Sequence, residues 1–217
     1  MDSSRGLSTL QAELLQAFFA RERRFVLTGG GALVGFHLRH RTSNDLDLFA
    51  KPPIGLDEGY LALQDAAKAL GGTIEVLRTF PEFRRVLVRR GSETVLVDLV
   101  IDRTPEVDHV VEAAHGVRLH SLREIAANKV CALLGRGEIR DLIDLRAILA
   151  TGVGLKQALA DAERKDGGVS AATLAWLLDG LRIGHGAPPL HGVDAAALEA
   201  FRVALVRQLR QLSLPSP

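Results

Sequence analysis

The spacing of apolar residues divides the chain into a mixed half and a helical half. The elements predicted in the first half are a helix from Ser8, a strand at 25–28, a glycine turn at 29–31, a helix at 32–38, a strand at 45–49, a helix at 56–70, and strands at 73–79, 83–90 and 94–101. From Ser121 onward the strand pattern stops, and the predicted helices lie near 121–134, 138–150, 154–165, 170–182 and 194–212. The sequence therefore predicts an α+β fold, with a mixed-sheet core over 1–118 followed by a C-terminal helical bundle over 119–217.

Composition and charge narrow the class of protein without naming an activity. The chain has 217 residues, of which 47% are hydrophobic and 24% are charged, and its net charge is +1. These values fit a globular protein without the global positive charge that attracts nucleic acid or anionic membranes. They do not exclude a local basic patch. Aromatic residues make up only 5% of the chain, which gives little support for a base-stacking surface.

The N-terminal segment and the single cysteine bear on the location of the protein. The first residues lack the basic-then-apolar order of a secretion signal, and the apolar runs are shorter than the roughly 20 residues that span a bilayer. Cys131 has no second cysteine for an internal disulfide, which suits a reducing compartment. We therefore expect a cytoplasmic protein that does not cross a membrane.

Two aspartates in the predicted strand at 45–49 are the first candidates for chemistry. Because successive strand residues point to opposite faces, Asp45 and Asp47 project together, while Leu46 and Leu48 face the core. Neighbouring carboxylates repel each other unless a cation lies between them, and Mg²⁺ prefers oxygen ligands of this kind. For this tripeptide alone, the solvated face of an edge strand is the favoured interpretation.

A third carboxylate favours the metal interpretation. Asp98 lies in the middle of the apolar run 94–101, which is typical of a strand buried on both faces. A buried carboxylate is costly unless it is neutralised, either by a shared metal or by an arginine of the segment 83–90. Three aspartates on neighbouring strands around one or two Mg²⁺ ions are the arrangement that phosphoryl or nucleotidyl transfer uses.

Three glycines precede the predicted helix at 32–38. Backbone N–H groups at a helix N-terminus bind phosphate oxygens well when no side chain obstructs them. Taken alone, Gly29, Gly30 and Gly31 indicate only a turn. Their position between a strand and a helix, followed by a strand with two candidate metal ligands, would place a triphosphate beside Mg²⁺.

These motifs resemble those of a known enzyme family, the AbiEii/AbiGii-type nucleotidyltransferases within the DNA polymerase β-like superfamily. The segments that carry the resemblance are Gly29-Gly30-x-Ala32-Leu33, His40-Arg41-x-Ser43-x-Asp45-Leu46-Asp47-Leu48-Phe49, the helix with Lys129, and Arg140-Asp141-Leu142-Ile143-Asp144-Leu145. The resemblance runs from Phe25 to about Leu149.

The resemblance implies that the mixed-sheet core is that of a metal-dependent nucleotidyltransferase with an NTP as substrate. The roles that it implies are Mg²⁺ binding by Asp45 and Asp47, triphosphate contact by Gly29 and Gly30, bracing of the nucleotide by Arg41 and Ser43, neutralisation of phosphate charge by Lys129, and a place for Asp141 in the same active site. Asp98 matches the third carboxylate of the wider superfamily, as a further Mg²⁺ ligand. Gly31 departs from the pattern, because superfamily members usually carry Ser or Thr at this position.

The resemblance also implies a biological role. The better-known relatives are toxins of two-gene toxin–antitoxin modules, and some modify tRNA ends. The expected partners are therefore an NTP, an acceptor such as tRNA, and a cognate antitoxin protein. Two alternatives stay open: a nucleotide-binding or partner-binding protein of the same fold with weakened catalysis, and a transferase that modifies a small molecule such as an aminoglycoside.

Overall fold

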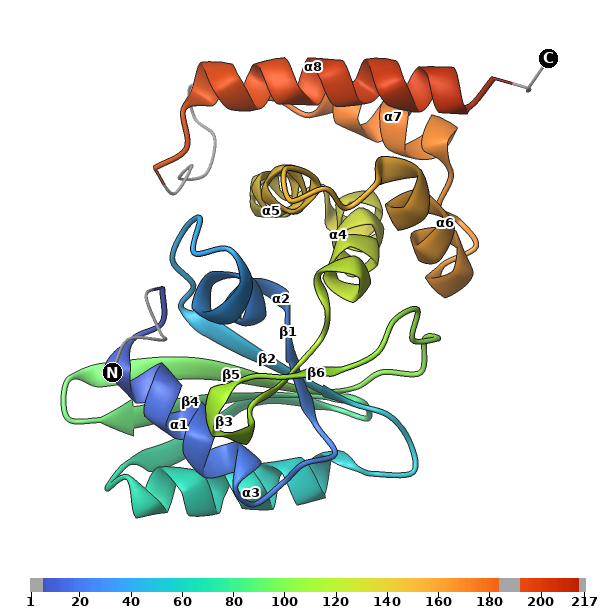
Figure 1. The fold of residues 1–217 in the computed structure, drawn as a ribbon. Coiled ribbons are helices and arrows are strands. Elements are labelled where there is room, and N and C mark those ends of the chain that lie inside the picture. The colour runs from blue at the N-terminus through green and yellow to red at the C-terminus, as the bar shows by residue number, and fades with distance from the viewer. Residues whose placement is uncertain (1–5, 184–191, 215–217) are drawn as a thin grey trace. The chain divides into compact units, whose positions relative to one another are not determined.

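The computed structural model describes residues 6–183 and 192–214, which divide into two compact units (Figure 1). The sheet unit comprises Met1–Arg103 and His109–Ser121, and the helical unit comprises Thr104–Asp108 and Leu122–Pro217. The sheet unit is mixed α/β and the helical unit contains α-helices, so the predicted α+β fold class is confirmed. The boundary drawn at 118/119 stays a prediction.

The sheet unit is built on a mixed β-sheet. Its described elements are α1 (Thr9–Phe19), β1 (Val26–Thr28), α2 (Gly29–Ala32), the π-helical segment η1 (Leu33–His37), β2 (Asp45–Ala50), α3 (Leu56–Ala69), β3 (Thr73–Phe80), β4 (Phe83–Arg90), β5 (Glu93–Ile101), β6 (Val111–Glu112), the 3₁₀ turn η2 (Ala114–Gly116) and β7 (Arg118–Leu119). The strand order is β3-β4-β5-β2-β1-β7-β6. β2 runs parallel to β5 and β1 parallel to β7, whereas the other neighbours are antiparallel.

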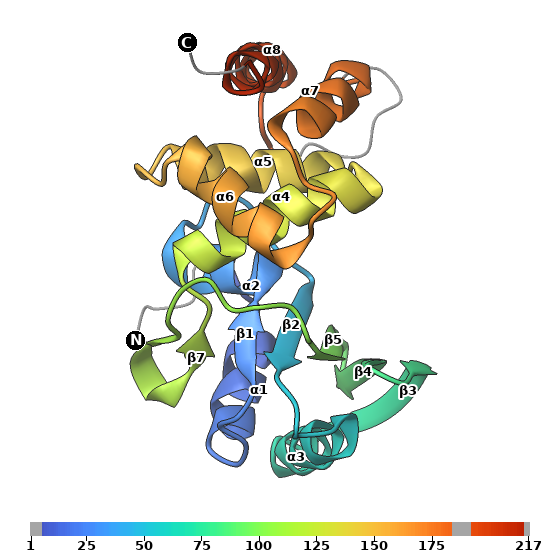
Figure 2. The same cartoon turned by 90° about the vertical axis from the view of Figure 1, so that its right-hand side faces the viewer.

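Two helices cover one face of this sheet. Figures 1 and 2 show α1 and α3 together on one side of the strands, with α2 on the other side above β1 and β2. α1 begins as predicted, because Ser8 and Gln11 form a capping box: Gln11 N donates to Ser8 Oγ at 3.2 Å, and Ser8 N donates to Gln11 Oε1 at 2.7 Å. The apolar stripe of α1 is fully buried and consists of Leu10, Leu14, Leu15, Phe18 and Phe19.

The helical unit follows the predicted pattern closely. Its described helices are α4 (Leu122–Arg136), α5 (Ile139–Leu149), α6 (Leu155–Lys165), α7 (Ala171–Gly180) and α8 (Ala195–Leu212). Asp194 caps α8 as expected, since its Oδ1 accepts a hydrogen bond from Ala197 N at 2.7 Å. α8 packs on α7, and its residues Leu198, Leu205 and Leu209 are buried. No helix among the described residues is both long and apolar enough to cross a membrane.

A buried glutamate holds the short segment Thr104–Asp108 to the helical unit. Glu124 is completely buried, and its Oε2 accepts hydrogen bonds from Val107 N at 2.8 Å and Asp108 N at 3.1 Å. Its other oxygen lies 2.5 Å from Lys165 Nζ, which is also buried. The ion pair neutralises a charge that would otherwise be costly in this position.

The sequence prediction was wrong for two local features of the sheet unit. The glycines at 29–31 are the first turn of α2 itself, not a turn before it, because the helix begins at Gly29. The two-residue strands β6 and β7 were not predicted, since they are too short to show a periodic pattern. β7 nevertheless extends the sheet by pairing with β1, where Leu27 and Leu119 are partners.

Candidate functional site

The register of the sheet brings the three predicted aspartates to one face. In the parallel pair of β2 and β5, Asp47 is the partner of Asp98. Along β2 the side chains alternate, with Leu46 and Leu48 each 1% exposed and Asp45 and Asp47 half-buried on the opposite face. Residues that are partners in a sheet project to the same face, so all three carboxylates share one surface.

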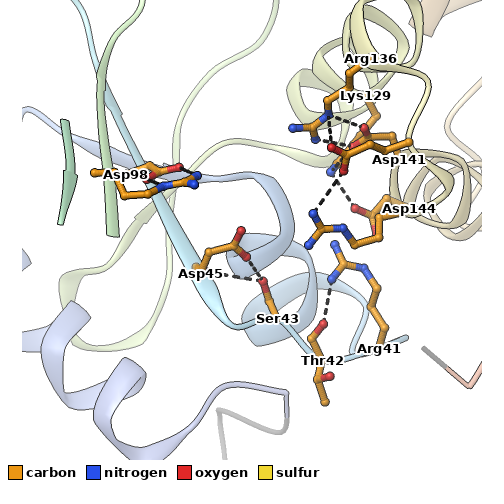
Figure 3. Close-up of polar contacts among 12 residues, drawn as sticks. Arg41, Thr42, Ser43, Asp45, Asp98, Lys129, Arg136, Asp141 and Asp144 are labelled. Atoms are coloured by element: carbon orange, nitrogen blue, oxygen red, sulfur yellow. Dashed lines mark hydrogen bonds and ion pairs between the residues drawn. The ribbon is translucent and has the colours of Figure 1, made fainter. Parts of the chain in front are cut away.

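Asp98 is held by an arginine from the neighbouring strand. Arg85 Nε donates to Asp98 Oδ1 at 2.8 Å and Arg85 Nη2 donates to Asp98 Oδ2 at 2.6 Å, which is a bidentate pair (Figure 3 shows it at Asp98). The Asp98 side chain is 9% exposed and that of Arg85 is 39% exposed. These hydrogen bonds raise the pKa of Arg85 against the effect of burial, and the charges of Asp98, Asp45 and Asp47 raise it further.

This ion pair is the alternative to metal binding that the sequence left open for Asp98. The arginine comes from β4, the strand formed by the predicted segment 83–90. A third metal-ligand role for Asp98 stays a prediction, since it requires the bidentate pair to open.

Gly29, the first residue of α2, lies directly beside the carboxylate of Asp47. Gly29 has a φ of +61°, and a Cβ at this position would lie 2.1 Å from Asp47 Oδ2. Only glycine fits both conditions. The start of α2 and the Asp47 carboxylate are therefore neighbours, as the predicted phosphate and metal subsites require.

Gly30 lies beside two further residues of the predicted site, Arg41 and Ser43. A Cβ on Gly30 would lie 2.8 Å from Arg41 Nη2 and 2.9 Å from Ser43 Oγ. Ser43 is buried and its Oγ donates to Asp45 Oδ1 at 2.8 Å, as Figure 3 shows. The structure thus places Gly30, Arg41, Ser43 and Asp45 in one cluster.

Close packing explains why position 31 carries glycine and not the usual serine or threonine. A Cβ on Gly31 would lie 3.2 Å from both the Asp45 backbone oxygen and Leu46 Cδ2. Serine or threonine would need these neighbours to shift by a few tenths of an ångström. The departure from the superfamily pattern therefore matches the close approach of α2 to β2.

Gly29→Ala is expected to lower activity much more than it would through backbone strain alone. The left-handed conformation costs an alanine about 1 kcal/mol, and the new methyl group also displaces the Asp47 carboxylate. Gly91→Ala is the matched control, because Gly91 has a φ of +57° with open space around it. Urea unfolding and nucleotide-transfer rates of both variants measure the two effects. Equal activity losses in both variants would contradict the assigned contact.

The helical unit holds a separate buried ionic cluster. Lys129 Nζ lies 2.9 Å from Asp141 Oδ1 and 2.7 Å from Asp144 Oδ2, and both carboxylates are completely buried (Figure 3). Arg136 Nε donates to Asp141 Oδ2 at 2.8 Å, and Arg136 Nη2 donates to Asp141 Oδ1 at 3.0 Å. The predicted residues Lys129 and Asp141 therefore contact each other directly.

The pKa values in this cluster favour the charged forms. Burial alone would lower the pKa of Lys129, but the charges of Asp144 and Asp141 outweigh it and hold the pKa above its usual value. Burial would raise the pKa of Asp141, but hydrogen bonds from Arg136 and the charge of Lys129 hold it below the usual value. Both shifts favour the ionised forms of Lys129 and Asp141.

Sequence reasoning gave too small a role to some residues of these clusters. Asp144 lies in the motif from Arg140 to Leu145 but was assigned no role, yet it is buried against Lys129, and Arg140 donates to Glu138. The shared helix face of Asp141 and Asp144 was the available signal. Arg136 had no signal of its own, because its role depends on how the chain turns between α4 and α5.

The acids of the sheet unit fit a Mg²⁺ ion that is completed by a substrate. Mg²⁺ commonly takes one or two protein carboxylates, and its other ligands are waters and substrate phosphates. Asp45 and Asp47 supply two such carboxylates beside Gly29. Across residues 6–183 and 192–214, no group of three or more His, Cys, Asp or Glu side chains is arranged to hold a metal ion. The residues present thus fit a site with two carboxylates.

The sheet unit combines a mixed sheet, two co-facial aspartates and a helix that begins at a glycine, as the resemblance to nucleotidyltransferases implies. The family model of the AbiEii nucleotidyl transferase toxins of type IV toxin–antitoxin systems matches residues 13–211. The chain belongs to this family, which confirms the resemblance found in the sequence.

Solved structures agree on the fold. MenT4, a nucleotidyltransferase toxin of Mycobacterium tuberculosis, is 18% identical, with 94% of this chain and 85% of that chain covered and a TM-score of 0.64. JHP933 of Helicobacter pylori is 23% identical, with 95% of this chain and 96% of that chain covered and a TM-score of 0.55. A search of curated proteins gave no match.

Proposed function

We propose that this protein transfers a nucleoside monophosphate from an NTP to an acceptor hydroxyl, in a Mg²⁺-dependent reaction, as the toxin of a toxin–antitoxin module. The observation that carries the proposal is the contact of Asp47 with the start of α2, beside the co-facial Asp45. Family membership supports transferase chemistry and the toxin role.

The proposed reaction needs few groups from the protein. The acceptor oxygen attacks the α-phosphorus, its proton leaves to solvent or a base, and the bond to pyrophosphate breaks. Bound Mg²⁺ would neutralise the charge that develops on the phosphate oxygens. Asp45 and Asp47 would hold the ion, and the backbone N–H groups of Gly29 and Gly30 would bind the triphosphate. The Ser43 hydroxyl orients the Asp45 carboxylate through its hydrogen bond.

Arg41 is proposed as a ligand of the nucleotide. Its Nη2 lies close to Gly30, and its Nη1 donates to the Thr42 backbone oxygen at 2.8 Å, which fixes the direction of the guanidinium (Figure 3). A fixed, planar cation suits a phosphate oxygen better than a mobile ammonium does.

Lys129 and Asp141 enter the proposal through the family motif. By that motif we propose that Lys129 neutralises phosphate charge and that Asp141 takes part in catalysis. Within the helical unit their ion pair keeps the lysine protonated, as that role requires. The type IV family also supports an antitoxin partner, and tRNA is the acceptor class that we propose.

Asp98→Asn is expected to destabilise the protein more than it lowers the catalytic rate. The substitution removes a buried carboxylate from a bidentate pair and leaves Arg85 without its ionic partner, which costs roughly 1–3 kcal/mol. Because Asp45 and Asp47 would remain, we expect kcat to fall less than tenfold. Thermal unfolding and single-turnover rates measure the two quantities. A fall in kcat as large as that of Asp45→Asn would make Asp98 a full metal ligand.

The direct test is a transfer assay. Purified protein is incubated with Mg²⁺, each of the four α-labelled NTPs and total RNA, and labelled products and pyrophosphate are measured. Label in RNA that disappears with EDTA supports the proposal. Pyrophosphate release that requires a small molecule in place of RNA would redirect it to the small-molecule alternative, and NTP binding without turnover would support a binding protein.

A further inference from the structure

The face of the sheet that carries the aspartates extends outward across β5, β4 and β3. Through the strand register, Asp47 pairs with Asp98, Asp98 with Arg85, and Arg85 with Arg78. These four residues form one row across the sheet, which we call the charged row. Neighbouring strands lie about 4.8 Å apart, so the arginines begin immediately beside the candidate metal ligands.

A second row, two residues further along β4, carries aromatic side chains. Phe80 of β3 pairs with Phe83 of β4, and their ring centroids lie 6.2 Å apart with an interplanar angle of 38°. The Arg85 guanidinium lies 5.7 Å from the centroid of Phe83, which links the two rows. Phe80 is 58% exposed although it is a large apolar residue at an edge strand. The Phe80–Phe83 pair therefore offers an aromatic surface to solvent at its Phe80 end.

This face is the one opposite the covering helices α1 and α3. The intervening side chains of β4 turn to those helices: Arg84 pairs with Asp57 and stacks on Tyr60, both from α3. Arg78 and Phe80 are exposed on the other side. Within the sheet unit, the fold therefore presents cationic and aromatic groups together beside the acids.

We propose that Arg78, Phe80, Phe83 and Arg85 form a binding surface for the unpaired 3′ end of an RNA acceptor, an inference that rests on the proposed function. Aromatic rings stack on unpaired bases, and a cation beside them neutralises the phosphates that connect those bases. Arg78 is exposed and supplies this cation, whereas the charge of Arg85 is already paired with Asp98 and its guanidinium lies over the Phe83 ring. The charged row leads from Arg78 to Asp47, so a strand bound along it ends beside the proposed metal ligands. This arrangement brings a terminal hydroxyl to the α-phosphate.

The kinds of side chain on this surface favour RNA over a protein partner. A protein that added a strand to the β3 edge would use the exposed backbone of β3 and need no arginines on the face of the sheet. The exposed Arg78 beside the Phe80–Phe83 pair instead matches a phosphate with its neighbouring bases. The low overall content of aromatic residues hid this pattern, since only their placement reveals it.

The test is the affinity of a fluorescein-labelled RNA hairpin with a single-stranded 3′ overhang, measured by anisotropy without NTP. Phe80→Ala is expected to weaken binding roughly 5- to 140-fold, because one base loses its stacking partner. Arg78→Gln is expected to weaken binding and to reduce the slope of log affinity against log salt by about 1. A blunt hairpin should bind weakly and show no effect of Phe80→Ala.

Leu61→Ala is the matched control. Leu61 is also 58% exposed, but it lies on α3, which covers the opposite face. We expect Leu61→Ala to leave RNA affinity unchanged. Equal affinity of wild type and Phe80→Ala for the overhang would overturn the inference. If wild type is a dimer in solution and Phe80→Ala dissociates it without loss of RNA affinity, the surface binds a second copy of the chain and the inference is also overturned. Failure of the proposed function is seen separately, as absence of nucleotide transfer by the wild-type protein.

Discussion

Asp45→Asn is expected to abolish nucleotide transfer while the protein remains folded. The amide keeps the shape of the side chain and the hydrogen bond from Ser43, but it removes half of the negative charge available to Mg²⁺ from Asp45 and Asp47. Loss of metal-based charge stabilisation removes several kcal/mol from the transition state, which corresponds to a rate lower by at least about a thousandfold. Asp47→Asn should have a similar effect.

The stability of the Asp45→Asn protein should equal or exceed that of wild type. Two co-facial carboxylates repel each other, and the substitution relieves this repulsion. Asp65→Asn is the control for charge alone, because Asp65 is exposed on α3. The measurements are single-turnover transfer with saturating Mg²⁺ and the midpoint of urea unfolding. Wild-type transfer by both Asp45→Asn and Asp47→Asn would remove the basis of the proposed mechanism.

Lys129→Met is expected to have the largest effect on stability. Lys129 neutralises two completely buried carboxylates, Asp141 and Asp144, and removal of one partner of a buried ionic cluster costs about 3–5 kcal/mol. Lys68→Met is the control, because Lys68 is exposed in the last turn of α3. Chemical unfolding of both variants measures the difference.

The double variant Lys129→Met with Asp144→Asn separates ionic from packing losses. Removal of one excess buried charge should return part of the lost stability. If the double variant is no more stable than Lys129→Met, the cost lies in packing and not in the unpaired carboxylate. Transfer activity of the refolded double variant then reports on the proposed role of Lys129 in neutralising phosphate charge.

The same cluster sets a dependence of stability on pH. Because the folded-state pKa of Asp141 is lowered, its contribution is complete above the unfolded-state pKa, near pH 4, and is lost as the pH falls through the folded-state value. The raised pKa of Lys129 acts at the other end: its contribution is complete below about pH 10 and is lost as the pH rises through the folded-state value. The cluster should therefore stabilise the protein throughout the neutral range.

Much of the fold could be predicted from the sequence because its elements are long and periodic. The helices of the helical unit and the strands β2 to β5 lie within about two residues of their predicted bounds, since burial of one face leaves a regular pattern. β6 and β7 escaped prediction because two residues carry no period. The start of α2 at Gly29 also escaped prediction, because glycine disfavours helices, and the positive φ and the close approach of Asp47 that require glycine there appear only in the folded chain.

The shared face of Asp45 and Asp47 was predictable from the sequence, but the contacts of the other candidate residues were not. Alternation along β2 correctly put Asp45 and Asp47 on one face, as the period of a strand requires. The register between β4 and β5 decides which arginine of β4 pairs with Asp98. Neither strand sequence alone determines this register. The aromatic pair of Phe80 and Phe83 likewise forms only when β3 and β4 pair.

Diffraction from crystals grown with Mn²⁺ and a non-hydrolysable NTP tests the central claim most directly. An anomalous difference map locates the metal independently of the refined coordinates. We predict a peak within bonding distance of carboxylate oxygens from both Asp45 and Asp47, with the triphosphate at Gly29 and Gly30. A bound nucleotide whose metal lies away from both carboxylates, or that binds without metal, would contradict the account.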